Sequence, residues 1–419
     1  MFTRLLQLDQ FTKYSDKSWI KVITGVRRSG KSILLRQVKD SLRRRGVGMD
    51  QLHVVRFNQL HRQLLIDWPS LAASIEKRLA AKKENYLFLD ELDQVDAVVP
   101  LLQDLLSRGN VNLFVTAATR SLIDRLSQLR AQLVVIPVLP LGFSEFCRYQ
   151  GHPADHQALY RYLNTGGFPF AQGVHDAHSL GNYLDEVFNT ILVGGFTKHG
   201  TLCNPFLTKQ LAIFLATQLG EAVNASKAVS GLQAAGVQVS NKTLATYLTF
   251  LQDTFLFYPC YELDLVRNRT KPTNVKYYPV DPSLRNYLTN QKGALSQANL
   301  EALLFIELVR RGYLVHSSKR FTFVADRGQQ RSYIQFRYSL RSQHDYDQVL
   351  AAFRTLPASA HKQLIVMQAG DMVVTAPDLP LIRLTNWLVT PQVNPVDHVA
   401  HGLVEDDVGP ALGGEDKLL

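Results

Sequence analysis

Short apolar runs alternate with helical stretches over residues 1–145. Five runs rich in β-branched, aliphatic and aromatic residues predict buried strands, at 20–24, 53–57, 86–89, 111–116 and 133–138. Between them, apolar residues recur at helical spacing, for example over 68–81 and 98–107. This alternation predicts an α/β core, a parallel sheet with helices on both faces.

The pattern changes after this core. A mainly helical segment over 146–204, interrupted by Gly-Gly-Phe-Pro at 166–169, predicts a small lid. Residues 291–390 return to mixed helix and strand patterns and predict a second α/β domain. The stretch 391–419 contains several prolines, glycines and acids and predicts a loose tail.

Residues 205–290 predict a helix-turn-helix pattern followed by a hairpin. One helix is expected over 224–235, and a second begins after Ser240, which can cap it. Two strand patterns follow, at 255–263 and 275–280. Helices followed by a hairpin are in the order of a winged helix.

The most specific signal is a glycine-rich turn between the first strand and the first helix. Its residues are Gly25, Val26, Arg27, Arg28, Ser29, Gly30, Lys31 and Ser32, in the spacing G-x-x-x-x-G-K-S. Glycines let backbone N–H groups wrap a polyphosphate, and the following helix adds the positive end of its dipole. Lys31 would contact the β- and γ-phosphates, and Ser32 would hold Mg²⁺. The motif therefore predicts a nucleoside triphosphate site.

Two acids follow the third predicted strand. Residues 86–91 read Tyr-Leu-Phe-Leu-Asp-Glu, so Asp90 and Glu91 lie at the carboxyl end of a buried strand. Open α/β sheets bind ligands at that edge. Asp90 would hold Mg²⁺, and Glu91 would polarise the attacking water. A water-activating carboxylate favours hydrolysis over small-molecule kinase chemistry.

Two threonines follow the fourth predicted strand. Thr116 or Thr119 could sense the γ-phosphate, and the alternative is a threonine that caps the next helix. For the base, the guanine-reading pattern Asn-Lys-x-Asp is absent, because residues 241–244 read Asn-Lys-Thr-Leu. Adenine is therefore preferred, and ATP with Mg²⁺ is the expected ligand.

The chain has 419 residues and a formal net charge of +10, which permits an acidic partner such as DNA without requiring one. In the predicted winged helix, Lys242 on the second helix and Arg267, Arg269 and Lys271 on the hairpin tip are candidate nucleic-acid contacts. The alternative is a module used for packing or protein contact. A protein partner and oligomerisation are both compatible with the sequence.

Three cysteines, Cys147, Cys203 and Cys260, are widely separated and form neither a disulfide framework nor a zinc pattern. No apolar run approaches the roughly 20 residues of a membrane-spanning helix, and no signal peptide is expected. These features predict a cytoplasmic protein without a membrane partner.

Six stretches together resemble a family of bacterial and archaeal AAA-like ATP-binding proteins, in which an AAA domain is fused to a C-terminal domain of unknown function. They are residues 22–32, whose double arginine marks the family, and residues 88–91, 139–146, 166–169, 278–285 and 307–313. The resemblance implies ATP binding and hydrolysis by an ATPase core, followed by a lid, a winged helix (205–290) and a terminal domain similar to restriction endonucleases (291–390).

The chain departs from this family pattern in the core. The family often ends the fourth strand with Thr-Gly-Ser-Asn, whereas residues 116–119 read Thr-Ala-Ala-Thr. A family arginine before the fifth strand is replaced by Gln132, and whether Arg130 substitutes for it is left open by the sequence. Because such an arginine strongly accelerates phosphoryl transfer, slow or absent hydrolysis is one expectation.

The terminal domain departs further. The acids and the lysine of a related nuclease would fall at Glu301, Thr322, Gln335 and Arg337. Only Glu301 is acidic, so we expect this domain to be non-catalytic. The sequence thus favours an ATP-driven switch or remodeller. The alternatives are a non-hydrolysing, nucleotide-gated adaptor and a DNA-binding regulator.

Overall fold

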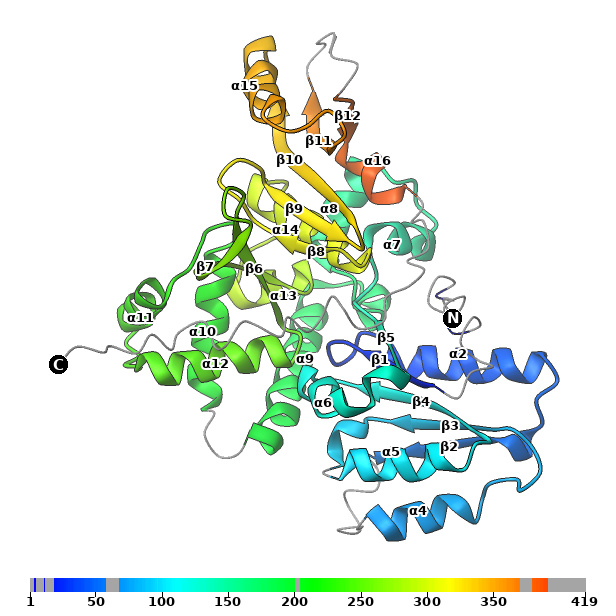
Figure 1. The fold of residues 1–419 in the computed structure, drawn as a ribbon. Coiled ribbons are helices and arrows are strands. Elements are labelled where there is room, and N and C mark those ends of the chain that lie inside the picture. Colours follow the sequence, from blue (N-terminus) through cyan, green and yellow to red (C-terminus); the bar gives the residue numbers. More distant parts are fainter. Residues whose placement is uncertain are drawn as a thin grey trace. The chain divides into compact units, whose positions relative to one another are not determined.

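A computed structural model describes residues 4, 11, 19–57, 68–95, 97–199, 204–369 and 379–390. The described residues fall into two compact units (Figure 1). Unit 1 contains the residues up to Leu139 together with Asp253–Phe255, and unit 2 contains the others, from Pro140 onward. The predicted tail, 391–419, lies outside the described residues.

Unit 1 is built on a five-stranded sheet in the order β2-β3-β4-β1-β5, with every neighbouring pair parallel. Its strands are β1 (Ile20–Thr24), β2 (Leu52–Arg56), β3 (Asn85–Asp90), β4 (Val111–Ala117) and β5 (Leu133–Pro137). The predicted α/β core with a parallel sheet is therefore confirmed. This order places β4 between β1 and β3, so the carboxyl ends of those strands share one edge.

Helices cover both faces of this sheet (Figure 1). They are α2 (Lys31–Arg44), α4 (Trp68–Glu76), α5 (Val98–Ser107) and α6 (Arg120–Arg125), with 3₁₀ turns η1 (Met49–Gln51), η2 (Leu92–Gln94) and η3 (Ser127–Gln132). The apolar side of α2 packs on one face with Phe88 and Phe114, whose rings stack 5.0 Å apart. Helices α4, α5 and α6 pack on the other face.

The helix predicted over 68–81 ends earlier than expected, at Glu76. The side chain of Asn85 accepts a hydrogen bond from Ala80 N at 2.9 Å and donates one to Ala80 O at 3.0 Å. These bonds hold Ala80 in a turn that leads into β3 and prevent the helix from continuing.

The first part of unit 2 is helical. Its helices are α7 (Phe143–Gln150), α8 (His156–Thr165), α9 (Ala177–His199), α10 (Pro205–Thr217), α11 (Ala225–Ala234) and α12 (Asn241–Asp253), with one 3₁₀ turn, η4 (Phe170–Gly173). The predicted cap of α12 is present, because Ser240 Oγ accepts from Thr243 N at 3.1 Å. Among the described helices, none is long and apolar enough to cross a membrane.

An antiparallel hairpin of β6 (Phe257–Asp264) and β7 (Arg269–Pro279) follows α12. The hairpin turn is shorter than the predicted strand patterns, 255–263 and 275–280, imply, because residues 269–273 also belong to β7. Asp264 accepts from Val266 N and Arg267 N, which closes a tight turn. Val223, before α11, pairs with Val275 of β7.

The last part of unit 2 is a mixed sheet in the order β12-β11-β10-β9-β8 with three helices beside it. The helix α13 (Pro282–Thr289) leads into this part. Its own elements are α14 (Gln297–Arg310), β8 (Leu314–His316), β9 (Phe323–Arg327), β10 (Gln330–Leu340), α15 (Gln343–Arg354), β11 (His361–Ala369), β12 (Leu381–Arg383) and α16 (Leu384–Val389). Strand β9 begins only at Phe323, because Ser318 Oγ accepts from Arg320 N and Phe321 N and keeps those residues in a turn.

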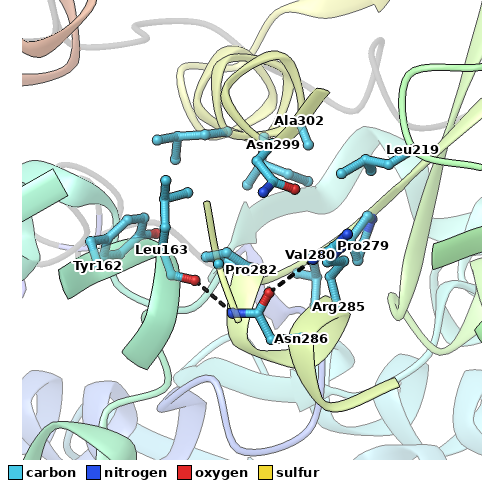
Figure 2. A pocket seen from close by; sticks show the side chains of 13 residues that line it. Tyr162, Leu163, Leu219, Pro279, Val280, Pro282, Arg285, Asn286, Asn299 and Ala302 are labelled. Atoms are coloured by element: carbon cyan, nitrogen blue, oxygen red, sulfur yellow. Dashed lines mark hydrogen bonds between the residues drawn. The ribbon is translucent and has the colours of Figure 1, made fainter. Parts of the chain in front are cut away.

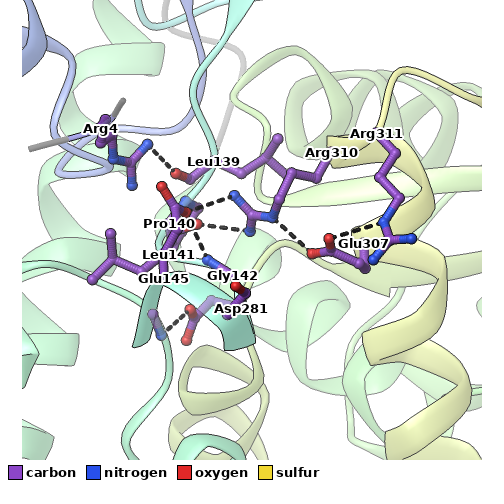
Figure 3. A network of polar contacts seen from close by, with 12 residues as sticks. Arg4, Leu139, Pro140, Leu141, Gly142, Glu145, Asp281, Glu307, Arg310 and Arg311 are labelled. Carbon is purple, nitrogen blue, oxygen red and sulfur yellow. Dashed lines mark hydrogen bonds and ion pairs between the residues drawn. The ribbon is translucent and has the colours of Figure 1, made fainter. Parts of the chain in front are cut away.

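The four family-like stretches of unit 2 meet in one buried polar network (Figure 3). Arg310 of α14 donates to Pro140 O at 2.7 Å and pairs with Glu307 and Glu145, at 3.0 and 3.5 Å. Nearby, Asp281 accepts from Gly167 N at 2.6 Å. The buried Arg310 therefore ties the start of unit 2 to α14.

Replacing Arg310 with methionine should destabilise unit 2. Glu145 would lose its cation while buried, and the Pro140 carbonyl would lose its donor, so we expect a loss of about 3 kcal/mol. Urea unfolding followed by far-UV circular dichroism measures it. Arg354→Met, at an exposed position of α15, is the matched control. Equal midpoints for the two variants would show that the buried network contributes nothing.

Candidate nucleotide-binding site

The glycine-rich turn forms a tight loop between β1 and α2. Gly25 has φ +144°, and a Cβ there would lie 2.2 Å from Val138 O, so only glycine fits. Gly30 has φ +103° and caps the N-terminus of α2. Backbone N–H groups at the start of a helix that begins this way are available to an anion.

Lys31 is the first residue of α2 and is buried, with 7% of its surface exposed. Its ammonium donates to Gly25 O at 2.7 Å and to Val26 O at 2.9 Å, so it folds back over the loop. Burial lowers the pKa of Lys31 to about 8, and the nearby acids Asp93, Glu91 and Asp90 oppose this change. The loop therefore encloses the Lys31 ammonium.

Asp90 lies beside the loop at the end of β3. Ser32 Oγ donates to Asp90 Oδ1 at 3.1 Å, and Thr116 Oγ1 of β4 donates to the same oxygen at 2.7 Å. The strand order explains this contact, because β4 lies between β1 and β3. A carboxylate and two hydroxyls thus converge at the mouth of the loop.

Glu91 follows directly and adopts the left-handed conformation, with φ +61°. Its backbone N–H donates to Thr116 Oγ1 at 2.8 Å. Its carboxylate pairs with Arg27 of the loop, with Nη1 and Oε2 3.6 Å apart. The strained backbone turns the Glu91 side chain toward the loop. Arg28, also left-handed with φ +67°, is exposed.

Thr119 does not reach this cluster. Its hydroxyl donates to Asp93 at 2.6 Å, and the same carboxylate accepts from Thr119 N and Ala118 N. Thr119 is the N-cap residue of α6 but makes no capping hydrogen bond through its side chain. The sequence alone predicts no role for Asp93. Its place three residues after Asp90, which ends a strand, is a signal in the sequence that could have drawn attention to it.

The donor set fits a magnesium nucleotide. A buried ammonium with only carbonyl partners suits a phosphate, which would replace those carbonyls. The hydroxyl of Ser32 and the carboxylate of Asp90 are oxygen ligands of the kind that Mg²⁺ takes. Bound Mg²⁺ would neutralise phosphate charge and orient the phosphates.

The low pKa of Lys31 makes nucleotide affinity depend on pH. Only the ammonium form attracts phosphate, and in the free protein this form is lost as pH rises through about 8. We expect affinity for Mg·ATP to fall little from pH 7.5 to 8 and then by up to about tenfold per unit. Binding titrations at pH 7.5 to 9.5 measure it. Flat affinity over this range would contradict the placement of phosphate on Lys31.

The candidate nucleic-acid contacts lie apart along unit 2's helix α12 and its hairpin. Lys242 is exposed near the start of α12, and Arg267 and Arg269 are exposed at the hairpin turn. Lys271 is half-buried and pairs with Glu262 at 3.0 Å, so its charge is partly neutralised.

The positions expected for nuclease chemistry are occupied by structural contacts. Glu301 accepts from Tyr278 Oη at 2.6 Å and from Lys276 Nζ at 2.9 Å. Thr322 Oγ1 accepts from Phe336 N, and Gln335 accepts from Thr322 N. Arg337, the fourth of these positions, is exposed on β10. Within the described ranges, no three His, Cys, Asp or Glu residues gather as a metal site.

A pocket in unit 2 lies among α8, α13 and α14 (Figure 2). Tyr162, Pro282 and Leu303 are among its lining residues, and Asn286 at its edge donates to Leu163 O at 2.8 Å. Its open volume of about 20 Å³ holds roughly one water molecule. This pocket is therefore too small for a nucleotide.

Two protein-family models match parts of this chain. Residues 17–147 match the AAA domain, and residues 156–295 match a domain of unknown function (DUF8612). The first match confirms the predicted AAA-like core. The second covers most of the predicted lid, 146–204, and all of the predicted winged helix, 205–290. The chain thus joins an AAA domain to a domain whose function is not defined.

Similar proteins include an uncharacterized protein of Haemophilus influenzae, 29% identical over 84% of this chain and 90% of its own. An uncharacterized protein of Methanocaldococcus jannaschii is 26% identical over 70% of this chain and 67% of its own. Among solved structures, a Walker-type ATPase of Pyrococcus abyssi aligns over 69% of this chain and 96% of its own, with 13% identity and a TM-score of 0.44. The RuvB Holliday junction branch migration motor of Thermotoga maritima aligns over 61% and 87%, with 15% identity and a TM-score of 0.32.

Proposed function

We propose that unit 1 binds Mg·ATP and hydrolyses it, and that the protein is a nucleotide-driven switch or remodeller. The observation that carries this proposal is the convergence of a phosphate loop with the Asp90–Glu91 acids. Ser32 Oγ lies 3.1 Å from Asp90, and Glu91 follows it at the same strand end. The match of residues 17–147 to the AAA domain supports it.

Each residue has a role in this proposal. The backbone N–H groups of residues 25–32 and the Lys31 ammonium bind the phosphates, while Ser32 and Asp90 hold Mg²⁺. Glu91 accepts a proton from the water that attacks the γ-phosphorus, the bond to the bridging β–γ oxygen breaks, and ADP leaves with inorganic phosphate. Thr116 holds Asp90 and the Glu91 backbone in place.

Release of inorganic phosphate by the purified protein tests this function. We expect release that requires Mg²⁺ and ATP and stops with EDTA. Nucleotide binding without release would select the alternative, a non-hydrolysing adaptor gated by ATP. Absence of binding to any nucleoside triphosphate would exclude both.

A second candidate function is DNA binding by residues 205–290. We infer a winged-helix-like module there, because the helices α10, α11 and α12 precede a hairpin. In addition, Val223 pairs with β7, and a winged helix has a short first strand at this place. In this arrangement α12 would meet the major groove and the hairpin turn the phosphate backbone. The two exposed arginines of that turn favour contact with nucleic acid.

Binding to a fluorescent DNA duplex at increasing salt tests this second function. Replacing both Arg267 and Arg269 with glutamine should weaken binding and reduce its salt dependence by about one to two counterions. Unchanged binding would leave the module as a protein contact. The terminal domain, residues 291–390, is in this view an endonuclease-like scaffold without catalysis, since Glu301 is engaged by Lys276 and Tyr278.

A further inference from the structure

Arg27 is a residue of the phosphate loop whose charged side chain lies beside Glu91. It stands in the phosphate loop two residues after Gly25, and its guanidinium lies 3.6 Å from the carboxylate of Glu91. The two side chains are 18% and 23% exposed, so water screens the pair only in part. A cation in the loop and the candidate water-activating acid thus hold each other.

The partners of Glu91 restrict what it can do in this state. Its backbone is fixed by Thr116 and has a left-handed φ of +61°, which holds the residue at the end of β3 beside the loop. The carboxylate oxygen that faces the Arg27 guanidinium is engaged by it and is not available to an attacking water. Glu91 is therefore restrained as long as Arg27 stays on it.

A nucleoside triphosphate would bring a stronger competitor for the same cation. The γ-phosphate carries more negative charge than one carboxylate and offers several oxygens to a guanidinium. A diphosphate would not reach as far. The guanidinium can therefore be shared between two anions, of which one is part of the protein and the other belongs only to the triphosphate.

We propose that Arg27 senses the terminal phosphate: it is paired with Glu91 in the free protein and transfers to the γ-phosphate of bound ATP, which releases Glu91 for water. This mechanism rests on the proposed ATP site. It adds that Glu91 becomes available to water only when a triphosphate is bound. Arg27 also supplies, from within the loop, a cation that Gln132, the residue before β5, cannot supply.

A double-mutant cycle of Arg27→Ala and Glu91→Gln tests this proposal. The affinity of each protein for Mg²⁺ with a non-hydrolysable ATP analogue, and for Mg·ADP, is measured by calorimetry. Arg36→Ala, at an exposed position of α2, removes an equal charge and serves as the control background. Arg27→Lys tests for partial rescue, and thermal melting checks that every variant is folded.

We expect Glu91→Gln to tighten the ATP analogue about tenfold in the wild-type and Arg36→Ala backgrounds, because Arg27 no longer has to leave its partner. In the Arg27→Ala background, Glu91→Gln should raise the affinity for the ATP analogue by less than about twofold. The affinity for Mg·ADP should change little in any of these variants. Arg27→Lys should keep part of the gain.

An equal gain with and without Arg27 would overturn the proposal, because it would mean that Glu91 merely repels phosphate. That result would leave the ATP site itself intact. A wild-type protein that binds neither nucleotide would instead overturn the proposed function, and the sensor with it.

Discussion

Lys31→Ala should weaken Mg·ATP binding by at least about 100-fold. The ammonium is buried in the loop, where it is held by two backbone carbonyls that phosphate would replace. A charged hydrogen bond to phosphate in a partly dry site contributes about 1.5–3 kcal/mol, and the ammonium would make more than one. Titration with a fluorescent ATP analogue measures the loss.

A matched control separates this effect from damage to α2. Lys39 lies on the same helix, half-buried and away from the loop, so Lys39→Ala should bind nucleotide like the wild type. Thermal melting should show both variants folded, since removing a buried charge from the loop relieves a desolvation cost. Wild-type affinity in Lys31→Ala would refute the assignment of the loop.

Glu91→Gln should abolish turnover while nucleotide binding persists. The amide keeps the shape of the side chain but cannot accept a proton from water, and general-base catalysis contributes about 10²–10⁴ in rate. We therefore expect the turnover number to fall at least about 100-fold, with the Michaelis constant unchanged or lower. Steady-state phosphate release measures both constants.

The control for this variant is Glu76→Gln on α4, where the side chain is 58% exposed and pairs with Arg108. It should hydrolyse ATP at the wild-type rate. If Glu91→Gln also does so, another group activates the water, and the role given to Glu91 is wrong.

Much of unit 1 could be predicted from the sequence because its signals are local. The run at 20–24 is β1 without any change of bounds, and the acids at 90 and 91 end a strand as expected. Short apolar runs between amphipathic helices leave few alternatives to a parallel sheet. The predicted bounds of elements were wrong where the hydrogen bonds of a single side chain form a turn. Asn85 forms such a turn after α4, and Asp264 forms one before β7.

The contacts within the site were harder to predict because they depend on strand order. Ser32 and Asp90 are 58 residues apart, and their contact requires β4 to lie between β1 and β3. Nothing in the sequence favoured Thr116 over Thr119 as the residue near the phosphates. In the structure, Thr116 contacts Asp90 and Thr119 contacts Asp93. The pairing of Arg27 with Glu91 left no pattern in the sequence, because it is set by loop and side-chain geometry across the sheet edge.

A crystal structure of the protein with Mg²⁺ and a non-hydrolysable ATP analogue tests the central claim most directly. We expect the triphosphate to lie along residues 25–32, with the Lys31 ammonium on phosphate oxygens in place of the carbonyls of Gly25 and Val26, and Mg²⁺ beside Ser32 and Asp90. A nucleotide bound elsewhere, with Lys31 still on those carbonyls, would contradict it.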